Sequence, residues 1–216
     1  EYMRQSLKVW AELGFSFDVV STGMILSAEQ AALVSDFCEQ SAKKGALVFV
    51  DPIMGDEGKL YNGVGEETVA HMRKMVAVAD CIVPNYTEAA YLADMPYHED
   101  MTEEEARALT IRLHEMGAKS VVVTSAKVDG ENCVVGYDGT EGEFFRIPFD
   151  LIPVRFVGTG DIFAAVMLGR LVDGVPLQES THRAMDAVRT MIDRNRDKED
   201  KYLGIPIETC LEVLDE

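Results

Sequence analysis

Two largely apolar runs, Ala46–Val50 and Ser120–Thr124, constrain the fold of this chain more than any other feature. Each has the length of a strand and is apolar at consecutive positions, which indicates burial on both faces of a sheet. Segments with helical start and stop signals separate the strands. This alternation predicts an α/β fold with a mostly parallel central sheet flanked by helices on both faces, a Rossmann-like three-layer sandwich.

Capping residues set the expected helix boundaries. Ser27 with Gln30, and Thr102 with Glu105, have capping-box spacing, and Gly45 and Gly117 are the expected stops of those two helices. The other expected elements are helices at 1–13, 66–78, 161–172 and 177–195, strands at 17–21 and 81–83, and a hairpin formed by 133–137 and 143–147. No repeat or linker divides the chain, so we expect one domain over residues 1–216.

Composition excludes several classes of partner. A formal net charge of −18 over 216 residues disfavours nucleic acid and anionic membrane surfaces, which would repel such a protein. The longest apolar runs are interrupted by glycine, proline or charge, so neither a signal peptide nor a spanning helix is expected. The cysteines are scattered without a Cys-x-x-Cys pair, which predicts reduced thiols in a cytoplasmic protein: Cys38, Cys81, Cys133 and Cys210.

Polar residues follow four of the predicted strands or precede the next helix. Ligands of open parallel sheets bind beyond the carboxyl ends of the strands. Asp51, Asn85, Thr124 and the turn at Gly158 occupy such positions. Each could be an ordinary turn residue, but their coincidence predicts a ligand site at one edge of the sheet.

The segment Gly158-Thr159-Gly160-Asp161 carries the chemistry of that site. Two glycines let the backbone approach an anion closely, and amides at a helix N-terminus can cradle a phosphate. Asp161 beside them is a candidate base. The alternative interpretation is a glycine turn with an acidic first-turn residue, and short glycine motifs carry that risk.

Four segments give the chain a resemblance to a known family. These are Asp51–Asp56 (DPIMGD) with Tyr61 shortly after it, Pro84–Ala89 (PNYTEA), Val123–Ser125 and Gly158–Asp161. In order and spacing they resemble the ribokinase-like superfamily, and within it the pyridoxal (vitamin B6) kinases, over essentially the whole chain. The resemblance implies an enzyme that phosphorylates the 5′-hydroxymethyl group of pyridoxal, pyridoxine or pyridoxamine with ATP.

The resemblance also implies roles for single residues. Asp161 would be the catalytic base, and the amides of Gly158, Thr159 and Gly160 would form the anion hole. Asp51, Asp56 and Glu88 would hold Mg²⁺, in part through water. The nucleotide phosphates would contact Asn85, Glu88, Thr124 and Ser125, with Tyr61 closing over them; Tyr61 could equally be a packed loop aromatic. The family further suggests a homodimer.

Three departures from the family pattern leave alternatives open. Met24 stands where an aromatic residue is usual near the substrate, which makes substrate preference less certain. Val83 stands where some relatives have a threonine near a monovalent cation, so that ion is left open. The family's opening strand and the segment that grips the pyridine ring have no counterpart, so we expect the working protein to be longer, because an interior strand would otherwise be missing.

Two rival functions follow. One is a hydroxymethylpyrimidine kinase of thiamine synthesis, which shares the aspartate and the anion hole but acts on a smaller ring. The other is a non-catalytic ligand-binding or dimer-forming relative that retains the fold; the intact Gly158, Gly160 and Asp161 argue against it.

Overall fold

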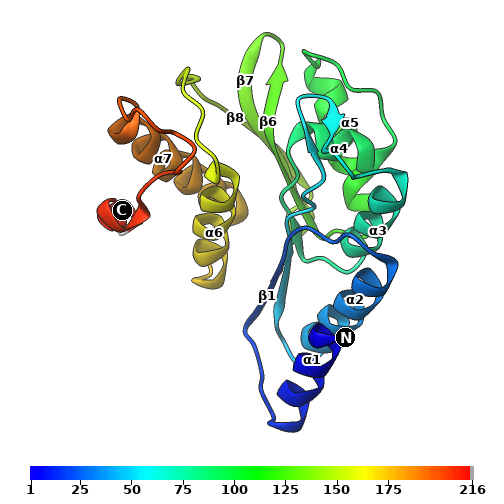
Figure 1. Ribbon diagram of the computed structural model, residues 1–216. Helices are drawn as coiled ribbons and strands as arrows, with labels where there is room; N and C mark the ends of the chain where they lie inside the picture. Colours follow the sequence, from blue (N-terminus) through cyan, green and yellow to red (C-terminus); the bar gives the residue numbers. More distant parts are fainter. Residues whose placement is uncertain (215–216) are drawn as a thin grey trace. The chain divides into compact units, whose positions relative to one another are not determined.

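Six strands form one sheet in the order β1-β2-β5-β6-β7-β8 in the computed structural model, which describes residues 1–214 (Figure 1). β1 (Val19–Thr22), β2 (Leu47–Val50), β5 (Cys81–Ile82) and β6 (Ser120–Val128) pair in parallel. β7 (Glu131–Asp138) pairs antiparallel with β6, and β8 (Glu143–Pro148) lies next to β7 at the sheet's end. The predicted mostly parallel α/β sheet is therefore confirmed.

The chain divides into two compact units, residues 1–146 and a second unit from Ile147 onward. The first holds the sheet up to the last two residues of β8, a small hairpin of β3 (Gly55–Asp56) and β4 (Lys59–Leu60), and five helices. Those helices are α1 (Tyr2–Glu12), α2 (Ala28–Ala42), α3 (Glu66–Val76), α4 (Tyr86–Ala93) and α5 (Glu103–Glu115). The expectation of a single kinase domain over 1–216 stays a prediction.

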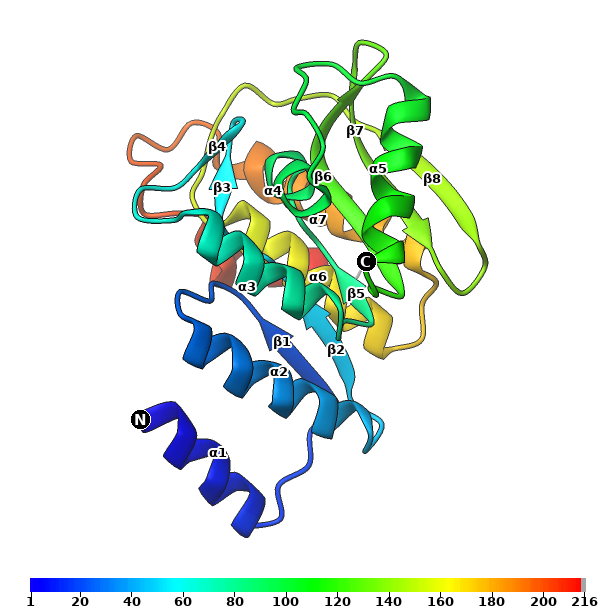
Figure 2. The same cartoon turned by 90° about the vertical axis from the view of Figure 1, so that its right-hand side faces the viewer.

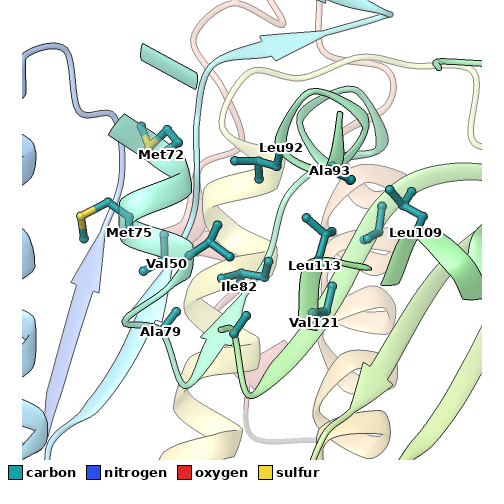
Figure 3. Close-up of a cluster of buried hydrophobic side chains, with 14 of the residues drawn as sticks. Val50, Met72, Met75, Ala79, Ile82, Leu92, Ala93, Leu109, Leu113 and Val121 are labelled. Carbon is teal, nitrogen blue, oxygen red and sulfur yellow. The ribbon is translucent and has the colours of Figure 1, made fainter. Parts of the chain in front are cut away.

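Helices α2 to α5 pack on one face of the sheet and bury the core of the first unit. Figure 2 shows α2 and α3 next to each other across the first strands. The core combines alternate strand positions, such as Val50, Ile82 and Val121, with helix side chains such as Met72 and Leu113 (Figure 3). Burying such side chains stabilises the fold by about 1.5–3 kcal/mol each.

The strands are buried at intervening positions too. Phe49 and Val122, between those core positions, are fully buried. The apolar runs of the sequence are therefore buried at consecutive positions, 48–50 and 121–123.

In the second unit, the described residues up to 214 form α6 (Thr159–Val172), α7 (Leu177–Asn195) and two short 3₁₀ helices, η1 (Ile207–Thr209) and η2 (Leu211–Leu214). Helices α6 and α7 pack together, and a separate apolar cluster that includes Phe156, Ile162 and Met191 forms the core of this unit. Arg170 donates to the Leu214 carbonyl at 2.5 Å and so ties η2 to α6.

The structure corrects several expected boundaries. α4 was not predicted, and α6 begins at Thr159, two residues before the expected start. The strand expected over 120–124 runs on to Val128 and returns through Asp129-Gly130 as a second hairpin. An Asp-Gly pair between alternating residues is a strong hairpin signal, so this turn was readable in the sequence.

The described residues 1–214 include no helix long and apolar enough to cross a bilayer. The cysteines Cys38, Cys81, Cys133 and Cys210 are all buried and free of disulfide bonds.

Candidate active site

The backbone brings three predicted site residues to neighbouring strand ends in the first unit. Asp51 follows β2, and its N–H donates to the Thr22 carbonyl at the end of β1 at 3.0 Å. Asn85 and Thr124 form an isolated parallel bridge, and the Thr124 N–H donates to the Pro84 carbonyl at 3.0 Å. Asp51, Asn85 and Thr124 thus share the carboxyl edge of the parallel strands, where ligands of such sheets bind.

Ser125 lies in a β-bulge next to Thr124. The register of β6 against β7 shifts between Val123 and Ala126, and Ser125 has a left-handed φ of 55°. Bulges commonly redirect side chains beside active sites. Ser125 is exposed here, while Thr124 is half-buried.

The predicted phosphate motif Asn85-x-x-Glu88 forms the first turn of α4. Asn85 is the N-cap: its Oδ1 accepts from the Glu88 N–H at 3.0 Å, and Glu88 Oε2 accepts from the Asn85 N–H at 2.9 Å. This is a complete capping box. The same spacing predicted the caps at Ser27 and Thr102, and at Asn85 it could have predicted α4 as well.

Glu88 also binds the loop that follows β2. Its Oε1 accepts from the N–H groups of Met54 at 2.9 Å and Gly55 at 3.4 Å. A carboxylate has about four lone-pair positions, and the amides of Met54, Gly55 and Asn85 use three of them. Glu88 therefore holds backbone on both oxygens, a role that its assignment as a magnesium ligand did not include.

Burial changes the proton affinity of Glu88. Its side chain is buried, and its pKa is raised from 4.5 to about 7, mainly by desolvation and in smaller part by the nearby Asp51 charge. The three backbone donors lower the pKa but do not cancel the burial. Near neutral pH this carboxyl is therefore close to its own midpoint of ionisation.

Asp56 and Tyr61 lie in and just after the β3–β4 hairpin. Asp56 Oδ1 accepts from the Glu57 N–H at 2.9 Å, and the Tyr61 N–H donates to the Met54 carbonyl at 3.0 Å. The Tyr61 side chain is 43% exposed, so it is not packed into the core of the first unit.

The acids of the first unit do not form a metal cage by themselves. Within residues 1–214, no group of three or more His, Cys, Asp or Glu side chains lies close enough to hold a metal ion. Mg²⁺ in phosphate-transferring sites takes one or two carboxylates and fills its other positions with water and substrate phosphates. Asp51 and Asp56 fit that sparse donor set, while Glu88 has one lone-pair position left after its three backbone bonds.

The remaining predicted residues lie in the second unit, at the start of α6. Gly158 is the N-cap, with a left-handed φ of 81° that favours glycine, and no side chain caps the helix. The first helical bond runs from the Ile162 N–H to the Gly158 carbonyl at 3.0 Å. The amides of Thr159, Gly160 and Asp161 therefore have no acceptor within the helix, as an anion-binding N-terminus requires.

Asp161 is exposed at the third position of α6 and is not turned into the core. It borders an open depression of about 650 Å³ in this unit, whose other lining is mostly apolar and includes Val157, Leu203 and Ile205. A carboxylate, helix amides and an apolar wall thus occur together around one depression.

Sequence reasoning missed Thr87. It is buried on the first turn of α4, and its Oγ1 accepts from the Gly58 N–H at 2.8 Å. No local pattern identifies this bond, because its two partners are 29 residues apart.

Comparison with known proteins adds independent observations. Residues 2–204 match the family model described as phosphomethylpyrimidine kinase. The pyridoxal kinases of Arabidopsis thaliana and Homo sapiens are each 33% identical over 171 residues, covering 76% and 70% of this chain and 53% of each relative. The chain therefore spans about half the length of the curated relatives it matches.

Solved structures share the fold. A Bacteroides thetaiotaomicron protein assigned as a phosphomethylpyrimidine kinase, in a crystal form with pyridoxal, is 32% identical with a TM-score of 0.92, covering 99% of this chain and 76% of that one. Pyridoxal kinase from Lactobacillus plantarum is 28% identical with a TM-score of 0.84, covering 98% of this chain and 76% of that one. The expected ribokinase-like fold class is confirmed by this likeness.

Proposed function

The chain belongs to the phosphomethylpyrimidine kinase family, and from that premise we propose that it transfers the γ-phosphoryl group of ATP to the 5′-hydroxymethyl group of pyridoxal, pyridoxine or pyridoxamine. One structural observation carries this proposal: exposed Asp161 stands beside the uncapped N-terminus of α6, whose first amides lack helical acceptors. The similarity to the plant and human pyridoxal kinases supports the choice of substrate class.

In the proposed reaction Asp161 orients the substrate hydroxyl and accepts its proton. The hydroxyl oxygen forms a bond to the γ-phosphorus while the bond to the β,γ-bridging oxygen breaks, and ADP leaves with the electron pair. Phosphoryl transfer depends mainly on positioning and charge stabilisation, so a carboxylate that accepts the proton late suffices. The amides of Gly158, Thr159 and Gly160 are the proposed donors to the transferring group.

We assign the nucleotide contacts to the strand ends of the first unit. Asn85, Thr124 and Ser125 are the proposed phosphate contacts, and Tyr61 is the proposed aromatic cover. Mg²⁺ would neutralise charge on the triphosphate, held by Asp51 and Asp56 and by Glu88 through water. That set fits the ion because Mg²⁺ prefers oxygen donors and keeps several waters.

The assembly and location are inferred separately. We infer a homodimer from the resemblance to pyridoxal kinases. The molecular mass of the purified protein, measured by light scattering, tests this inference. A reducing cytoplasm is supported by the four buried, unpaired cysteines.

A hydroxymethylpyrimidine kinase is the second candidate, favoured by the family description and by Met24, which stands exposed where the pyridoxal kinase pattern has an aromatic residue. Turnover of pyridoxal and of hydroxymethylpyrimidine, each at saturating Mg-ATP, separates the two. We expect faster phosphorylation of pyridoxal. Faster phosphorylation of the pyrimidine would reassign the substrate, and no ATP consumption with any B6 vitamer would favour a non-catalytic relative.

A further inference from the structure

The β3–β4 hairpin is too small to hold its own position. Its strands have two residues each, with Gly55 opposite Leu60 and Asp56 opposite Lys59. Glu57 and Gly58 form the turn, with left-handed φ values of 51° and 76° that match a two-residue hairpin loop. Isolated two-stranded hairpins are marginal in water even when longer, so contacts with the rest of the first unit must fix this one.

The base of the hairpin is fixed by the capping box of α4. Glu88 accepts from the amides of Met54 and Gly55, and Asn85 Nδ2 donates to the Gly55 carbonyl at 2.8 Å. Gly55 is needed for the close approach of the two hairpin strands, because a Cβ there would lie 2.5 Å from the Lys59 carbonyl oxygen.

The tip of the hairpin is held by Thr87 and two aromatic rings. The Gly58 N–H, at the second turn position, donates to Thr87 Oγ1 at 2.8 Å. The Tyr97 ring packs against the same residue, and its nearest atoms lie 3.1 Å from where a Gly58 Cβ would be. Tyr97 in turn stacks on Tyr86, with ring centroids 4.7 Å apart. The turn is therefore tethered from one side by a hydrogen bond and supported by packing.

We propose that Thr87 is a positioning residue that tethers the hairpin tip and thereby orients Asp56 for binding of the magnesium nucleotide. Two hydrogen bonds at neighbouring residues connect Thr87 to Asp56. Thr87 accepts from the Gly58 amide, and the adjoining Glu57 amide donates to the Asp56 carboxylate at 2.9 Å. Thr87 touches neither nucleotide nor metal in this scheme. The inference rests on the proposed function for its nucleotide, whereas the tether itself belongs to the free protein.

Thr87→Val tests the tether with little change in shape, because valine replaces the hydroxyl by a methyl group and leaves the Gly58 N–H without its acceptor. Thr87→Ser retains the hydroxyl and is the rescue variant. Thr110→Val is the matched control: Thr110 is also buried on a helix of the first unit, and its Oγ1 donates to the Arg107 carbonyl at 3.0 Å, away from the hairpin.

Amide hydrogen exchange over residues 54–61 is the first measurement. We expect exchange at the hairpin to accelerate about fivefold to tenfold in Thr87→Val, which corresponds to one lost hydrogen bond, and to stay unchanged in Thr87→Ser and Thr110→Val. Unchanged exchange in Thr87→Val would overturn the tether whatever the protein's activity.

Calorimetric binding of Mg²⁺ with a non-hydrolysable ATP analogue is the second measurement. We expect Kd to rise about fivefold in Thr87→Val, to recover in Thr87→Ser, and to stay at the wild-type value in Thr110→Val even where that variant is less stable. Faster exchange with an unchanged Kd would overturn the role in nucleotide binding. A wild-type protein that binds no nucleotide would instead refute the proposed function, a failure that the exchange data distinguish from loss of the tether.

Discussion

Asn85 and Glu88 cap each other across the first turn of α4, each accepting the other's backbone N–H, at 3.0 and 2.9 Å. The pair joins two segments of the predicted site, because Glu88 also accepts from Met54 and Gly55 beyond β2. A local helix cap has therefore become the anchor of the loop that carries Asp56.

Glu88 should make the stability of the ligand-free protein depend on pH. Its pKa rises from 4.5 to about 7 on folding, so the folded state binds the proton more tightly. The stabilisation from the protonated carboxyl is present below pH 4.5 and is lost as pH rises through about 7, up to about 3 kcal/mol in all. Urea unfolding of wild type and Glu88→Gln, in EDTA at pH 5 and pH 8, measures it.

Glu88→Gln has no carboxyl at this position, so its unfolding free energy should lack the pH-dependent contribution of Glu88. We expect the unfolding free energy of wild type minus that of Glu88→Gln to fall between pH 5 and pH 8. A difference that stays constant, or that rises with pH, would show that the pKa of Glu88 is not raised.

Asp161→Asn should lower turnover strongly while leaving the fold intact. Loss of the proposed base should lower kcat at least 100-fold, a loss comparable to that of an anion-hole donor. Because Asp161 is exposed, unfolding free energy should fall by less than about 1 kcal/mol, the contribution of an acid near a helix N-terminus. Asp173→Asn, at the C-cap of the same helix, is the control and should retain wild-type turnover. A near-normal kcat in Asp161→Asn would show that Asp161 is not the catalytic base.

Gly158→Ala and Gly160→Ala should separate backbone strain from ligand approach. Alanine at 158 must adopt a left-handed φ of 81°, which should cost about 1–2 kcal/mol of stability, measured by urea unfolding. At Gly160 a Cβ would meet no atom within 4 Å, so stability should be nearly unchanged. If phosphate approaches the Gly160 amide as proposed, Gly160→Ala should still raise KM for ATP. Wild-type KM in that variant would exclude close approach at this residue.

Gly55→Ala should displace the β3–β4 hairpin. An alanine Cβ would lie 2.5 Å from the Lys59 carbonyl oxygen, closer than real Cβ contacts allow, so the hairpin must shift. We expect faster amide exchange over residues 54–61 and weaker nucleotide binding. Gly65→Ala, in the following loop, has open space around its Cβ and should leave both unchanged. If Gly55→Ala and Gly65→Ala show the same amide exchange and the same nucleotide affinity, the hairpin is not held in a fixed position.

Much of the scaffold could be predicted because its signals are local. The caps at Ser27 and Thr102 are confirmed, and the strand predicted at 46–50 is observed at 47–50, since capping and continuous burial involve residues near in sequence. α4 was missed because its N-cap motif was interpreted only as a ligand motif. The β3–β4 hairpin was missed because two-residue strands leave no periodic pattern.

By itself, the sequence determined which polar residues follow which strands and that a glycine turn with an acid begins α6. The tertiary structure alone decided that Glu88 is buried with a raised pKa and that Thr87 binds an amide 29 residues away. The physical reason is that desolvation and long-range hydrogen bonds depend on neighbours brought together only by folding, whereas capping and strand patterning depend on neighbours along the chain.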